Sequence, residues 1–168
     1  MTKASLGKRA LVAAAVVLFG AGGAAGADPH QVQKGDITIA SRIVRASIPG
    51  SPNSAAYMVI ANGGAQPDAL VSARCACAAS VEIHKSTIMR GVSMMTTAAP
   101  VAIPAHGKVE FQPNGYHLML TGLKEPLRDG RQQLITLVFR RAGTVSAKFR
   151  ISARIALGSA APMRGMGH

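Results

Sequence analysis

The sequence predicts an all-β domain of the sandwich or barrel class. Many short runs of β-branched and apolar residues follow one another, and glycine, proline, asparagine or aspartate separates most of them. No long run shows the 3.6-residue apolar period of an amphipathic helix, and the chain contains no internal repeat. These observations favour one core enclosed by several short strands.

The first 27 residues have the composition of a secretory signal peptide. Lys3, Lys8 and Arg9 form a basic start, residues 10–19 are apolar, and small residues ending at Ala27 offer an A-x-A-like cleavage site. The apolar stretch is shorter than the roughly 20 residues that a membrane-spanning helix needs, so an uncleaved anchor is disfavoured. We expect cleavage after Ala27 and export to an oxidising compartment.

Basic residues outnumber acidic ones. Nineteen Lys and Arg face seven Asp and Glu, and the formal net charge of +12 falls to +9 once the leader and its three basic residues are removed. The charges are scattered and aromatic residues make up 4% of the chain, so no nucleic-acid partner is expected. A basic surface suits transient contact with an anionic membrane surface or an acidic partner, or serves solubility alone.

The expected strands lie within a domain of residues 28–157. They are 37–47, 55–62, 69–74, 80–86, 91–97, 108–112, 116–122, 132–140 and 144–157. The strand at 116–122 follows Asn114-Gly115, a dipeptide that strongly favours a tight turn. That turn delivers the next five residues directly and therefore helps to aim their side chains.

Two histidines and two methionines stand out in these expected strands: His84, Met95, His117 and Met119. His117 and Met119 are two residues apart, so they share one strand face, whereas Leu118 and Leu120 face the other side and enter a core. His84 ends a strand-like run in which Val81 and Ile83 occupy the opposite face.

The spacing of these residues indicates a metal site. Ten residues separate His84 from Met95, twenty-one separate Met95 from His117, and one separates His117 from Met119. Imidazole and thioether form a borderline-to-soft ligand set that suits Cu(I) and has little use for Mg, Ca or Mn. Our interpretation is that the four side chains converge on one copper ion, while Met94 faces away. The alternative from the residues alone is a surface histidine with methionines that fill the core.

The pattern His84-x10-Met95-x21-His117-x-Met119 resembles the signature of the periplasmic copper chaperones of the PCuAC family. Flanking segments are similar too, and the likeness covers about residues 36–152. Ser93 departs from it, since family members often carry another methionine there. The resemblance implies a cupredoxin-like Greek-key β fold and one Cu(I) held by the four residues. It also implies delivery of copper toward the CuA site of cytochrome c oxidase, through a CuA-containing oxidase subunit or another copper-transfer protein.

Cys75 and Cys77 have three alternative roles. Two cysteines in an exported chain usually pair, but one intervening residue closes a small ring and disulfide geometry is demanding. The other roles are an auxiliary thiolate copper site and a link to another chain. A cysteine with two histidines also makes a blue-copper centre, so a copper redox or electron-transfer protein is the alternative function. In cupredoxins, however, that cysteine lies in a C-terminal loop, whereas these two precede His84.

Residues 158–168 are expected to form a flexible tail, because glycine and alanine bury too little surface to fold alone. Met163 and Met166 are candidate auxiliary ligands for Cu(I), and His168 could hold Cu(II) there. The alternative is a frayed terminus without a role.

An enzyme is the less favoured class. The sequence contains no nucleophile elbow, HExxH motif or glycine-rich phosphate loop. Neutral thioethers cannot form disulfides, so they suit a copper carrier in an oxidising compartment. A protein that sequesters copper for tolerance would share this chemistry and differ only in the fate of the metal.

Overall fold

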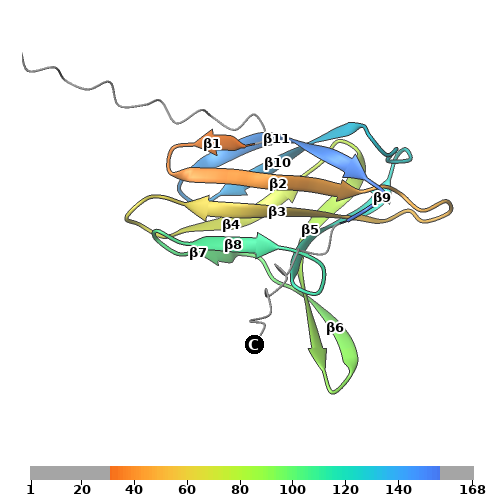
Figure 1. Ribbon diagram of the computed structural model, residues 1–168, viewed down its shortest axis with the longest axis horizontal. Helices are drawn as coiled ribbons and strands as arrows, with labels where there is room; N and C mark the ends of the chain where they lie inside the picture. The colour runs from red at the N-terminus through yellow and green to blue at the C-terminus, as the bar shows by residue number, and fades with distance from the viewer. Residues whose placement is uncertain (1–30, 156–168) are drawn as a thin grey trace, which may run out of the picture.

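Eleven strands and no helix make up residues 31–155, the part of the chain that the computed structural model describes (Figure 1). The strands are β1 (Val32–Lys34), β2 (Ile37–Arg45), β3 (Ser54–Asn62), β4 (Asp68–Arg74), β5 (Ala78–Met89), β6 (Val92–Thr97), β7 (Val101–Ile103), β8 (Lys108–Phe111), β9 (Tyr116–Leu123), β10 (Gln132–Phe139) and β11 (Gly143–Ser152). The all-β prediction is confirmed.

The strands form one hydrogen-bonded path that folds over itself. Its order is β6-β5-β9-β8-β3-β2-β11-β10-β4-β7, with β1 paired to β2 and a further pairing of β9 with β3. Contacts of β3 with β7 and of β4 with β5 close the path into two layers around one core (Figure 1). Neighbours that are distant in sequence, such as β2 with β11 and β5 with β9, produce the crossing connections of the predicted Greek-key arrangement.

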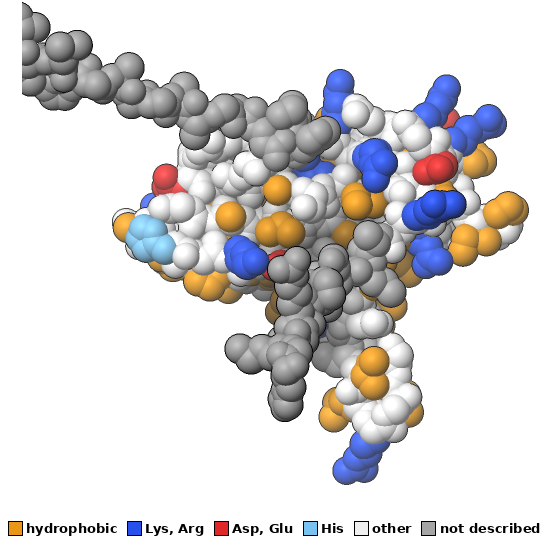
Figure 2. Space-filling view, in the orientation of Figure 1, with side chains coloured by type: hydrophobic (Ala, Val, Ile, Leu, Met, Phe, Trp, Pro, Cys, Tyr) orange, Lys and Arg blue, Asp and Glu red, His pale blue; other side chains and the backbone are white. Residues whose placement is uncertain are grey.

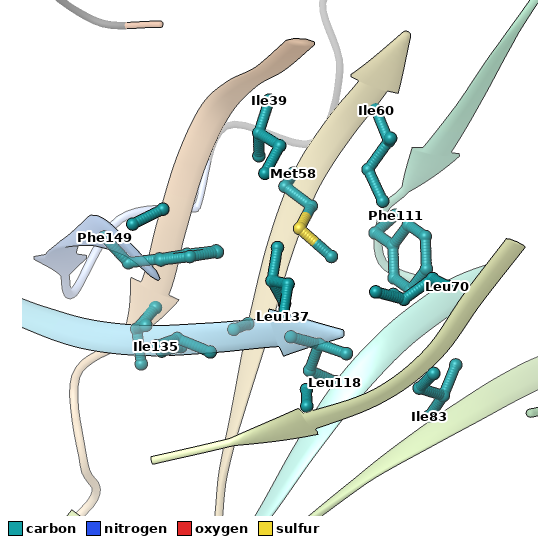
Figure 3. Close-up of a cluster of buried hydrophobic side chains, with 14 of the residues drawn as sticks. Ile39, Met58, Ile60, Leu70, Ile83, Phe111, Leu118, Ile135, Leu137 and Phe149 are labelled. Atoms are coloured by element: carbon teal, nitrogen blue, oxygen red, sulfur yellow. The ribbon is translucent and has the colours of Figure 1, made fainter. Parts of the chain in front are cut away.

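Side chains that alternate along the strands fill the core. Strand β3 shows the two-residue period clearly, since Ala56, Met58 and Ile60 are buried and the residues between them are partly exposed. Figure 3 shows Met58 and Ile60 among aliphatic and aromatic side chains of several other strands. Complete burial of one such large side chain stabilises the fold by about 1.5–3 kcal/mol.

Some element boundaries differ from the sequence prediction. Strands β1 and β7 were not predicted because three residues are too few to show a period. Strand β11 ends at Ser152 instead of residue 157, since the Ser152 hydroxyl donates to the Arg154 carbonyl and accepts from its N–H in a turn. Strand β5 extends beyond residue 86 to Met89, so the β5–β6 hairpin is longer than expected.

A disulfide joins Cys75 to Cys77 in the turn between β4 and β5, with Cα atoms 5.1 Å apart. Cys77 is buried in the core and Cys75 is half-buried. Of the three alternative roles of Cys75 and Cys77, the structure therefore contains the disulfide. Neither sulfur is a thiolate in this form, so an auxiliary copper site at these cysteines would require reduction of the bridge.

Both ends of the chain lie outside the described residues. They include the predicted signal peptide, residues 1–27, and the predicted tail, residues 158–168, with Met163, Met166 and His168. Their roles stay predictions. Between residues 31 and 155, the fold contains no helix with the length and apolar character needed to cross a membrane.

Candidate metal centre

The candidate centre is built on the neighbouring antiparallel strands β5 and β9. His84 lies opposite His117, and Glu82 lies opposite Met119. Directly opposite residues of an antiparallel pair project to the same face, so all four side chains share one face of the sheet. On the other face Ile83 and Leu118 enter the core (Figure 3).

Strand β6 adds Met95 to this face. Met95 pairs with Ser86, which lies two residues beyond His84 along β5. Met94 pairs with Thr87 and therefore projects to the opposite side of the hairpin, as the sequence predicts. The hairpin closes through Arg90 and Gly91, whose φ angles of 52° and 78° are those that a two-residue hairpin turn requires.

Three of the four candidate ligands line one surface hollow of about 430 Å³. They are Met95, His117 and Met119. His84 lies beside the hollow and contacts His117 edge to face, with 5.9 Å between the ring centroids. The structure thus brings the four predicted residues together from three strands, although His84 is not part of the wall.

A hydrogen bond fixes the tautomer of His84. Its Nε2 lies 2.8 Å from a carboxylate oxygen of Glu82, and an ionised carboxylate can only accept, so Nε2–H donates. The lone pair is then on Nδ1. That atom is buried and has no hydrogen-bond partner. A buried acceptor without a partner is costly, and a bound cation would satisfy it.

His117 is fixed in the opposite tautomer. Its Nδ1–H donates to the carbonyl oxygen of Gly115, 3.1 Å away, because a carbonyl can only accept. The lone pair of His117 is therefore on Nε2. Gly115 belongs to the turn before β9, in which Asn114 has a positive φ of 65° and Gly115 N–H donates to the Gln112 carbonyl. The tight-turn prediction is confirmed, and this turn orients the His117 ring.

The wall of the hollow contains no carboxylate and no cysteine among the described residues that form it. Arg45 and Tyr57 contribute polar groups. Burial raises the pKa of the Tyr57 hydroxyl, although the positive charge of Arg45 lowers it in part, so the phenol is neutral at pH 7. Residues 31–155 also contain no cluster of three or more His, Cys, Asp or Glu able to hold a metal. A hard, oxygen-ligated cation is therefore a poor fit here.

Sequence reasoning did not assign roles to Glu82, Tyr57 or Ser86. The two-residue period already places Glu82 on the face of His84, so this partner could have been found. Tyr57 comes from β3 and reaches the hollow only because β3 pairs with β9. No local sequence signal specifies that pairing.

The fold defines a class of protein, the cupredoxin-like PCuAC domains. The structure matches the "Copper-bound PCuAC domain from PmoF2" with a TM-score of 0.64 and 26% identity, covering 74% of this chain and 99% of that domain. It matches the structure of "CuI-DR1885" from Deinococcus radiodurans with a TM-score of 0.59 and 30% identity, covering 76% and 83%. The resemblance drawn from the sequence is confirmed.

The chain belongs to the family described as "Putative lipoprotein LpqE-like", which matches residues 37–151. A related protein from Leifsonia xyli subsp. xyli (strain CTCB07), "Putative lipoprotein Lxx21020", is 32% identical to this chain over 149 residues. The alignment covers 86% of this chain and 89% of the relative. The family match lies within the domain that the structure describes, whereas the alignment with the relative is longer than that domain.

Proposed function

We propose that this protein is an exported copper carrier that binds Cu(I) through His84, Met95, His117 and Met119. The observation that carries the proposal is the arrangement of the two imidazoles. They lie in contact across β5 and β9, and each has its N–H engaged elsewhere and its lone pair free. The copper-bound and Cu(I)-bound neighbours of the same fold support the identity of the metal.

The donor set suits Cu(I). His84 would contribute Nδ1 and His117 would contribute Nε2, and the thioethers of Met95 and Met119 would complete the ligands. All four donors are neutral, and thioethers favour Cu(I) over the hard divalent cations. The carboxylate-free wall adds no anionic ligand that would favour another metal.

The exposure of the donors suits release of the metal. His117 is 5% exposed, whereas Met95 is 52% exposed on the projecting hairpin. The thioether of Met95 is therefore the ligand that an incoming donor can replace first, after which the ion can move by stepwise exchange. Such a transfer needs no nucleophile or general base, so we assign a carrier and not an enzyme.

The acceptor would be a CuA-containing oxidase subunit or another copper-transfer protein in the periplasm. Export is supported by the lipoprotein descriptions of the family and of the Leifsonia relative. The basic composition would favour an acidic acceptor and brief contact with an anionic membrane surface.

Titration of the mature protein, residues 28–168, with Cu(I) in competition with a chromogenic chelator tests the ligand set. We expect His84→Ala, Met95→Leu, His117→Ala and Met119→Leu each to weaken Cu(I) binding by at least about tenfold, equivalent to 1.4 kcal/mol. Met94→Leu is the matched control, because Met94 lies on the same hairpin and faces away. If Met95→Leu and Met94→Leu bind Cu(I) with equal affinity, Met95 is not a ligand.

The redox alternative has a spectroscopic test. The bridged cysteines do not line the hollow, which favours the carrier. Addition of Cu(II) should therefore give no intense thiolate-to-copper band, and the appearance of one would favour electron transfer. Transfer of bound copper to an apo CuA domain would separate delivery from sequestration.

A further inference from the structure

The β5–β6 hairpin exposes an unusual amount of apolar surface. Eight large hydrophobic side chains are exposed in residues 31–155, and five of them lie on this hairpin: Ile88 (64%), Met89 (61%), Val92 (62%), Met94 (48%) and Met95 (52%). The ribbon projects from the body of the domain in Figure 1, and Figure 2 shows hydrophobic side chains along it with a basic side chain at its tip. A concentration of this kind marks an interaction site.

The apolar side chains are divided between the two faces of the hairpin. Ile88 and Met95 belong to the face of the candidate copper centre. Met89, Val92 and Met94 project to the other side, and none of the three lines the hollow. We refer to these three residues as the outer face. The proposed copper site gives no reason for the outer face to be apolar, so a partner must explain it.

We propose that the outer face docks a Cu(I)-acceptor protein through an apolar surface of that protein, while the acceptor's own copper ligands reach Met95 on the opposite face of the hairpin. This inference rests on the proposed function. Met95 is the most exposed of the four donors, so an incoming ligand must approach along this hairpin. The outer face lies on the reverse side of the two strands that carry His84 and Met95, so an acceptor that reaches Met95 and also covers this face encloses the projecting hairpin.

The charge of the region narrows the choice of partner. No Asp or Glu occurs from residue 83 to residue 109, whereas Lys85 and Arg90 lie on the hairpin. An acceptor with an apolar centre and an acidic rim is therefore complementary. A lipid surface would also accept an apolar, basic tip. However, lipid has no soft donor for Cu(I) and would cover Met95 without receiving the metal, so we favour a protein.

A triple variant tests the docking role directly. In Met89→Thr/Val92→Thr/Met94→Thr the outer face becomes polar while threonine keeps the strand preference of the ribbon. Leu134→Thr/Val71→Thr is the matched control, because these exposed side chains lie on β10 and β4, away from the hairpin. Val92→Thr alone replaces the triple variant if circular dichroism shows that the latter does not fold.

Three measurements separate docking from copper binding. We expect the outer-face variant to retain the parent Cu(I) affinity and the parent rate of transfer to the small chelator bicinchoninate. Its second-order rate of transfer to an apo CuA domain should fall about tenfold or more, with the control unchanged. A parent protein that binds no Cu(I) would instead defeat the proposed function itself.

Other outcomes would overturn the inference. An unchanged rate to the CuA domain would do so, and so would an equal loss of rate to bicinchoninate, which would place the effect on release and not on docking. Loss of binding to phosphatidylglycerol vesicles with unchanged transfer would assign the face to a membrane. Dissociation of a dimer with unchanged transfer would assign it to a second copy of the chain.

Discussion

At the scale of single residues, the two histidines of the centre are prepared for a metal by different partners. Glu82 accepts from Nε2 of His84, and a backbone carbonyl accepts from Nδ1 of His117. Glu82 acts through its side chain and can be replaced by mutation, whereas the Gly115 carbonyl belongs to the backbone and cannot. Glu82 therefore offers a test of whether the orientation of His84 matters to copper, separate from the ligand itself.

Replacement of Glu82 should weaken Cu(I) binding without removing a ligand. Loss of such an outer partner costs 10- to 100-fold in metal affinity, and about tenfold is expected here because the Glu82 side chain is 54% exposed and solvent screens it. Glu82→Leu should show this loss in chelator competition, and Glu82→Gln, which keeps an acceptor oxygen, should show less.

Glu110→Leu is the control for this experiment, since Glu110 is another strand glutamate, paired with Lys108 on the surface. Nitrogen-15 spectra of the imidazoles add a second readout. The protonated nitrogen of His84 should be Nε2 in the parent and should become mixed in Glu82→Leu. Parent-like affinity and an unchanged tautomer in that variant would show that Glu82 has no part in the site.

At the scale of elements, β9 places two of the candidate ligands and depends on a glycine near its end. Gly122 has a φ of +67°, and a Cβ at this position would lie 2.9 Å from the Cβ of Ala79. Gly130 has a similar φ of +79° but faces open space. The two glycines therefore separate backbone strain from steric conflict.

Gly122→Ala should destabilise the domain more than Gly130→Ala. Left-handed backbone costs a non-glycine residue about 1–2 kcal/mol, which both variants incur. The contact with Ala79 adds about 1–3 kcal/mol to Gly122→Ala alone. Urea unfolding monitored by circular dichroism measures the difference. Equal free energies of unfolding would show that the Ala79 side chain moves aside without cost.

Local patterns in the sequence predicted most of the elements. The apolar run of β3, closed by Gly63 and Gly64, and the Asn114-Gly115 turn are local signals, and both appear in the structure where the sequence places them. The three-residue strands β1 and β7 carry no such signal. The extension of β5 to Met89 was missed because an exposed ribbon has no buried face to produce alternation.

At the scale of the whole molecule, the candidate site depends on pairings that join distant parts of the chain. The residue period predicts that His117 and Met119 share a face, but it says nothing of which strand lies beside them. The register that sets His84 opposite His117, and the hollow shared with Tyr57, follow from the closed arrangement of β5, β9 and β3. Local patterns could not predict that His84, Met95, His117 and Met119 group together. That prediction came from the spacing that these residues share with the PCuAC family.

Elsewhere in the molecule one carboxylate joins β4 to the turn between β10 and β11. Asp68, at the start of β4, accepts from the N–H groups of Ala69, Arg141 and Ala142 at 2.7, 2.8 and 3.0 Å. The last two lie in the turn between β10 and β11. Burial would raise the pKa of Asp68, but the N–H groups of Ala142, Arg141 and Ala69, with the charge of Arg141, outweigh it and the pKa is lowered.

Because the pKa of the Asp68 carboxyl is lowered, the free energy of unfolding of the domain depends on pH in the acid range. The folded pKa of Asp68 lies below the usual value of 3.8, so its contribution is complete above that value and is lost as the pH falls through the folded pKa. Asp68→Ala leaves the three N–H donors without their acceptor and should lower the free energy of unfolding by about 3 kcal/mol at pH 7. Below the folded pKa of Asp68 the gap between variant and parent should narrow, because protonation removes the charge that strengthens these bonds in the parent.

Urea unfolding at pH 7 and at pH 2–3 measures the gap, with Asp129→Ala as the control, since Asp129 makes a single exposed bond to Ala153. A gap that stays constant with pH would show that the charge of Asp68 does not help to hold β4 to the turn between β10 and β11.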